Sequence, residues 1–233
     1  MKTLLSLAAL AFLAGVAPVS ASIVDVSFIG TQPGGAADVP GLFGAPNTNL
    51  TPSAFSLTFR FDLSKGTTFP LSGGGTDVLG GTGFRTTSPS IGWSVTIDGV
   101  TVKVPGGSAT AQLQAIPGTP STLDVAAFGP SAAPGHTNGA LFDFRSADGS
   151  LPTTLNANYD YLVKPGDGIS ADPSFIIWTA GGGSAGLNGG EISISEIKFS
   201  VEAPAATPGM GLSGLVGLAA LGLAARRRRQ GTA

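Results

Sequence analysis

The fold is decided by the stretch Trp93–Val104, WSVTIDGVTVKV, in which apolar and polar residues alternate on both sides of Asp98-Gly99. Alternation with a period of two predicts strands that have one buried face and one solvated face. Aspartate and glycine both tolerate positive φ, so Asp98-Gly99 favours a two-residue type I′ turn. Pairing outward from this turn sets apolar residues opposite one another, as Ile97–Val100, Val95–Val102 and Trp93–Val104. The turn and the alternation therefore predict the same hairpin, with these six residues on one face and Trp93 in the core.

Other stretches of the chain show the same alternation, and glycine- and proline-rich joints separate them. They are Val24–Phe28, Phe55–Leu63, Phe142–Arg145 and Phe175–Trp178. No stretch of the central region carries an apolar stripe with the 3.6-residue period of a helix. We therefore expect residues 22–202 to form one all-β domain, an antiparallel β-sandwich or jelly-roll-like fold with a single core between its sheets.

The last predicted strand changes phase part-way along its length. Ile192 and Ile194 alternate with serine, whereas Ile197, Phe199 and Val201 follow one position out of phase. A uniform strand would send its second half to the wrong face of the sheet. An extra residue at Ser195-Glu196 restores the phase, so we expect a β-bulge there.

The N-terminus has the pattern of a secretory signal peptide over residues 1–21. Lys2 precedes an apolar run, Leu4–Val16, which is too short for a stable membrane-spanning helix. Small or medium residues at Val19 and Ala21 predict cleavage between Ala21 and Ser22. The expected partners at this stage are the secretion translocon and signal peptidase, and the alternative is an uncleaved N-terminal anchor.

Residues 203–233 read as a membrane-directed tail. A short linker leads into a charge-free stretch with an expected helix at about 209–225, and an arginine cluster follows it: Arg226, Arg227, Arg228 and Arg229. At 1.5 Å per residue this helix falls slightly short of the ~30 Å hydrocarbon core. Because positive residues stay on the cytoplasmic side, the arginines would hold the central domain outside. We expect the tail to anchor the chain in the membrane at least transiently.

The tail resembles the PEP-CTERM sorting tail of exported proteins of Gram-negative bacteria. Val201, Glu202, Ala203 and Pro204 stand in the place of the Pro-Glu-Pro motif, without its first proline and with an alanine between glutamate and proline. The resemblance implies recognition by an exosortase-type membrane protease and cleavage near Glu202–Pro204. It also implies an inner-membrane-anchored intermediate and then the cell surface or extracellular space, often in association with exopolysaccharide and biofilm. It covers about thirty residues and assigns no site in the central domain.

Charge and cysteine content exclude several classes of function. All fourteen acidic residues but only seven of the twelve basic ones lie in residues 22–202, which gives this region a net charge of −7. Nucleic-acid binding needs a clustered basic face, so we expect no nucleic-acid partner. The chain has no cysteine, which excludes disulfides, thiol nucleophiles and cysteine-ligated metals.

Two groups of residues are candidates for ligand binding. Tyr159 and Tyr161 flank Asp160 in an extended segment, so both rings should lie on one side, where they could contact a sugar. Asp160, Asp167 and Asp172 supply hard oxygen ligands for calcium, although solvated turn aspartates explain the same pattern. His136 is the chain's one histidine. It stands in a turn-rich segment and cannot build a triad or a multi-histidine zinc site.

These observations favour a structural or adhesive protein of the envelope or exopolysaccharide matrix, with no enzymatic activity and no cofactor. The alternative is a carbohydrate-binding module, calcium-assisted or not. An extracellular hydrolase comes third, because it needs a carboxylate pair at a defined separation that sequence spacing does not provide.

Overall fold

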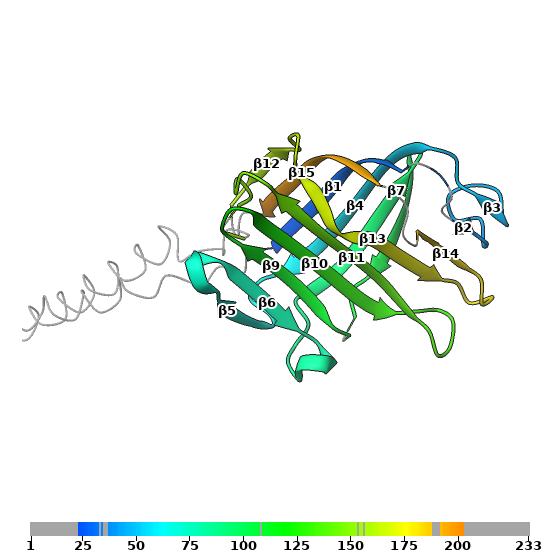
Figure 1. Cartoon of the computed structure of the whole chain (residues 1–233). Helices are drawn as coiled ribbons and strands as arrows, with labels where there is room; N and C mark the ends of the chain where they lie inside the picture. Colours follow the sequence, from blue (N-terminus) through cyan, green and yellow to red (C-terminus); the bar gives the residue numbers. More distant parts are fainter. Residues whose placement is uncertain are drawn as a thin grey trace, which may run out of the picture. The chain divides into compact units, whose positions relative to one another are not determined.

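The computed structural model describes residues 23–32, 34, 37–107, 109–152, 154–155, 157–187 and 192–202, and of residues 169–173 it describes only the backbone. Two antiparallel sheets form its layers (Figure 1). The six-stranded sheet has the order β12 (Tyr159–Leu162), β15 (Ser193–Glu202), β1 (Ile23–Gln32), β4 (Ser53–Asp62), β7 (Ser90–Ile97), β8 (Val100–Pro105). The nine-stranded sheet has the order β3 (Thr48–Asn49), β2 (Ala37–Asp38), β14 (Ser184–Leu187), β13 (Gly168–Trp178), β11 (Thr137–Ser146), β10 (Ser121–Pro130), β9 (Ala111–Ile116), β6 (Thr76–Gly80), β5 (Thr67–Pro70). Two 3₁₀ helices, η1 (Ser72–Gly74) and η2 (Thr82–Phe84), flank β6. The predicted all-β class with antiparallel sheets is confirmed.

The β7–β8 hairpin has the predicted register. Its three apolar pairs are Ile97–Val100, Val95–Val102 and Trp93–Val104. Asp98 and Gly99 have φ values of 49° and 79°, as a type I′ turn requires. The depth of burial differs along the apolar face, because Trp93 is 3% exposed whereas Val100, at the hairpin tip on the edge strand, is 42% exposed.

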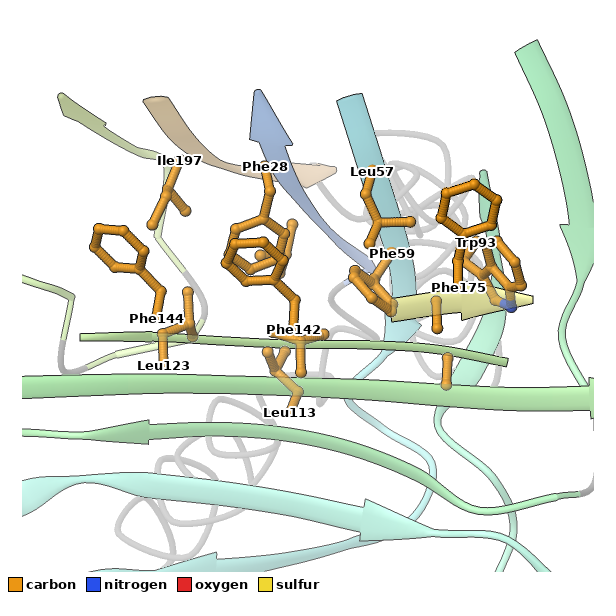
Figure 2. Packing of buried hydrophobic residues seen from close by; sticks show 14 of the residues in the cluster. Phe28, Leu57, Phe59, Trp93, Leu113, Leu123, Phe142, Phe144, Phe175 and Ile197 are labelled. Atoms are coloured by element: carbon orange, nitrogen blue, oxygen red, sulfur yellow. The ribbon is translucent and has the colours of Figure 1, made fainter. Parts of the chain in front are cut away.

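The core lies between the two sheets, where the apolar faces of their strands meet (Figure 2). Phe28 of β1 stacks on Phe142 of β11, with ring centroids 3.9 Å apart. The alternation predicted for β4 buries every second residue, and the facing sheet contributes Leu113, Leu123 and Phe144. Burial of each such side chain contributes about 1.5–3 kcal/mol to folding.

The predicted bulge is present in β15. Ile29 pairs with Glu196 but Gly30 pairs with Ile194, so Ser195 is the extra residue. Ile194 before the bulge and Ile197 after it are both buried. The bulged strand passes close to Gly30, where a Cβ would lie 1.9 Å from the carbonyl oxygen of Ser193. Glycine at position 30 is therefore a requirement of the bulge.

Several predicted segments lie outside the described residues: the signal peptide 1–21, the Ala21/Ser22 junction, the tail helix 209–225 and the cluster Arg226–Arg229. Within the part of the chain that the structure describes, no helix has the length and apolar character needed to span a membrane.

Substituting Gly30→Ala should destabilise the domain by about 2–3 kcal/mol, since the new Cβ meets backbone that cannot move without disturbing the bulge. Urea unfolding of the purified protein measures this. Gly168→Ala is the matched control, because a Cβ at Gly168 meets nothing within 4 Å. Equal stability of the two variants would contradict the role given to Gly30.

Candidate functional site

The outer face of the nine-stranded sheet carries an apolar depression of about 450 Å³. Its floor crosses four strands in one row, in which Phe128 pairs with Gly139, Gly139 with Ile176, and Ile176 with Gly186. Leu141 borders the row along β11. Phe128 is 36% exposed and Ile176 is 37% exposed, so their apolar surface is open to a ligand.

The depression exists because a glycine stands beside the exposed phenylalanine. A Cβ at Gly139 would lie 2.5 Å from Cδ1 of the Phe128 ring. The ring therefore lies over the backbone of β11, and any side chain at position 139 would displace it. The ring thus occupies the space that a side chain at position 139 would take, and it forms part of the apolar floor of the depression.

A row of polar side chains lies next to the depression on the same face. Asp77, Gln114, Asp124 and Asp143 are in register across β6, β9, β10 and β11. Asp143 follows Leu141 by two residues on β11 and so points to the same face of the sheet. Gln114 donates a hydrogen bond from Nε2 to Oδ2 of Asp77 over 3.1 Å. The face thus combines apolar surface with hydrogen-bonding groups.

The carboxylates of this row have raised pKa values. Burial, together with the charges of Asp143 and Asp77, raises the pKa of Asp124 to about 6. Burial also raises the pKa of Asp143 and of Asp77. Among the described residues, none of these three carboxylates forms an ion pair with a lysine or arginine. Asp77 is buried and accepts from Gln112 and Gln114, whereas Asp124 and Asp143 are half-buried and can accept hydrogen bonds from a ligand.

The structure places Tyr159 and Tyr161 on one side of β12 with Asp160 on the other, as expected. Their rings are stacked with centroids 6.3 Å apart. Tyr161, however, is 3% exposed, and its hydroxyl bonds to Oδ2 of Asp167 over 2.5 Å. The Tyr159 hydroxyl donates to the carbonyl oxygen of Ser150. The sugar contact predicted for this pair needs correction, because the ring of Tyr161 is packed inside the domain and is not open to a ligand.

The aspartates predicted to bind calcium do not come together as a site in the described residues. Asp160 is exposed on β12, and the side chain of Asp172 lies outside the described residues. Burial acts to raise the pKa of Asp167, but hydrogen bonds from the Tyr161 hydroxyl and from the backbone N–H groups of Lys164 and Ala147 lower it overall. Within the described residues, no group of three histidine, aspartate or glutamate side chains could hold a metal ion.

A serine–lysine contact near these tyrosines was not anticipated from the sequence. Lys164 Nζ lies 2.9 Å from Ser150 Oγ and 2.7 Å from Asp148 Oδ2. A lysine acting as general base needs a lowered pKa. Its hydrogen bond with Asp148 instead raises the pKa of Lys164, which keeps the ammonium charged. This contact therefore fixes the loop and does not activate Ser150.

The residues of the expected processing motif lie partly in the folded domain. Val201 and Glu202 end β15, where Glu202 pairs with Ile23, whereas Ala203 and Pro204 lie outside the described residues. Arg60 Nη2 donates to Oε1 of Glu202. Ile23 and Glu202, the first and last residues that the structure describes, are thus paired in the six-stranded sheet.

Comparisons with models of protein families, with curated proteins and with solved structures found no match to this chain. The assignment of the candidate site therefore rests on the geometry of this chain alone. Sequence reasoning missed the row of Asp77, Asp124 and Asp143, although period-two alternation in β9 to β11 does place polar residues on the outer face. What it lacked was the order of the strands, which aligns residues that are far apart in the chain.

Replacing Asp124 with asparagine should stabilise the domain at pH 7.5. A raised pKa means that the folded state binds the proton more tightly, so the charged carboxylate destabilises the fold above pH 6 and this cost disappears as the pH falls towards 4. The shift to about 6 corresponds to at most ~3 kcal/mol, and solvent screening at this partly exposed position reduces the expected gain to about 1 kcal/mol.

Urea unfolding at pH 7.5 and pH 4 measures this gain, with Asp160→Asn on the exposed side of β12 as the control for removing one charge. A gain that is the same at both pH values, or that the control reproduces, would contradict the assignment.

Proposed function

We propose that this protein is exported to the envelope of a Gram-negative bacterium, where it has a structural or adhesive, non-enzymatic role in the exopolysaccharide matrix. The observation that carries the proposal is the apolar depression at Phe128 and Ile176 beside the in-register row of Asp77, Gln114, Asp124 and Asp143. We assign polysaccharide binding to this outer face of the nine-stranded sheet. In this proposal the domain is a jelly-roll-like sandwich between a signal peptide and a membrane-inserted sorting tail.

The two parts of the face match the two kinds of surface that a sugar ring presents. The carbon-bound hydrogens of the ring pack against apolar side chains such as Phe128 and Ile176. The hydroxyl groups donate to carboxylates and exchange hydrogen bonds with the amide of Gln114. This combination favours a polyhydroxylated ligand over a purely apolar one.

Charge narrows the class of polysaccharide. The region 22–202 has a net charge of −7, and the three carboxylates of the row add local negative charge. An anionic polymer would be repelled unless divalent cations bridged the two. The proposed ligand is therefore a neutral or amino-bearing polysaccharide, bound without calcium.

The delivery steps belong to the same proposal. The translocon and signal peptidase would act on residues 1–21, and an exosortase-like membrane protease would act near Glu202–Pro204. Because Ile23 pairs with Glu202, the two proposed cuts would lie beside the same end of one strand pair.

A glycan array with neutral, amino-bearing and acidic polysaccharides, read with and without calcium, tests the binding site. Wild-type protein should bind neutral or amino-bearing glycans equally in both conditions. Phe128→Ala should weaken binding about five- to tenfold, or ~1–1.4 kcal/mol, since it removes the stacking surface.

Ser94→Ala, on the outer face of the six-stranded sheet, is the control and should bind as wild type. The absence of any glycan binding, or wild-type affinity in Phe128→Ala, would show that this face is not the site.

A further inference from the structure

We propose that the folded domain holds its own processing motif closed, and that the end of β15 must leave the sheet before the tail is cut. This inference rests on the proposed sorting function and adds its regulation. Its basis is the position of Val201 and Glu202, which belong at once to the motif and to β15. We call three residues the latch: Arg60, which binds Glu202, Asp25, which binds Arg60, and Asn158, which binds Val201.

The first part of the latch is an arginine that joins three strands. Arg60 of β4 donates from Nη1 to Asp25 of β1 over 2.9 Å and from Nη2 to Glu202 of β15. The hydrogen bond to Glu202 is the largest cause that raises the pKa of Arg60. Glu202 therefore has its side chain committed to the domain and not to a protease.

The second part of the latch holds the backbone of the motif. Val201 donates its N–H to Oδ1 of Asn158 over 2.7 Å. On that side of β15 the ladder with β12 stops at the pair Tyr159–Phe199, so Asn158 continues it by one side-chain contact. On the other side, pairing with β1 continues to Ile23–Glu202.

A protease that binds its substrate as an extended strand needs the backbone hydrogen-bonding groups of that strand. The N–H of Val201 is bound to Asn158, Glu202 is paired with Ile23, and the glutamate side chain is bound to Arg60. When opening is fast relative to cleavage, the rate of cutting follows the population of the open form. Because exposed ion pairs contribute only ~0.2–1 kcal/mol, the latch slows processing and does not prevent it.

The test follows loss of the tail from the full-length protein by pulse-chase and intact mass in the producing cell. Arg60→Ala and Asn158→Ala should each speed tail removal about two- to fivefold. Lys198→Ala is the matched control: it lies on the same strand and breaks an ion pair with Glu196, but it does not contact the latch, and it should process at the wild-type rate.

A second readout separates opening of the strand end from unfolding of the domain. Glutamyl endopeptidase is added to the purified full-length chain, and cutting after Glu202 is compared with cutting after Glu196 inside β15. The latch variants should raise the first rate relative to the second.

The outcomes distinguish the latch from the proposed function. A wild-type chain that keeps its tail in the cell overturns the sorting function and the latch with it. A wild-type chain that loses its tail at the same rate as both latch variants overturns the latch alone. Equal acceleration at Glu202 and Glu196 also overturns the latch, since it indicates general destabilisation.

Discussion

Antiparallel pairing of β1 with β15 is the constraint on which the rest of the structure depends. It joins the first and last strands of the domain along nearly their whole length, from Ile23–Glu202 to Thr31–Ser193. Both strands are interior strands of the six-stranded sheet. The sheet is therefore completed only when the end of the domain, up to residue 202, pairs with its beginning. Phe28 of β1 stacks on Phe142 of the other sheet, so the pairing also holds a strand that contributes to the core.

The outer faces of the two sheets differ in how their polar groups are satisfied. On the six-stranded sheet, hydroxyls pair with one another, as in Ser27–Thr58 at 2.8 Å, and Arg60 pairs with Asp25 and Glu202. On the nine-stranded sheet, Asp124 and Asp143 face each other across neighbouring strands with raised pKa values. These groups of the six-stranded sheet are paired with one another, whereas Asp124 and Asp143 form no ion pair among the described residues and can bind a ligand. This contrast is why the proposed function is assigned to the nine-stranded sheet.

Local patterns predicted local geometry well, and they failed where long-range alignment decides. Turn chemistry at Asp98-Gly99 and the phase change at Ser195 gave the hairpin register and the bulge. Alternation placed Tyr159 and Tyr161 on one side of a strand but could not show that this side faces the core. The row from Asp77 to Asp143 comes from four strands whose order is set by tertiary packing, and Arg60 meets Glu202 across 142 positions of sequence. The spacing of residues along the sequence does not predict such long-range contacts.

The register of β1 against β15 can be tested with paired cysteines, since the chain has none of its own. Beyond the bulge, Thr31 pairs with Ser193, whereas an uninterrupted ladder would pair Thr31 with Ile194. Directly opposed residues lie about 4.5–5.5 Å apart between Cα atoms, within the range that a disulfide spans. The bulged pairing predicts that Thr31→Cys/Ser193→Cys oxidises readily and Thr31→Cys/Ile194→Cys does not. The pairing on which the domain depends would be contradicted if the second pair oxidised more readily than the first, or if neither pair formed a disulfide.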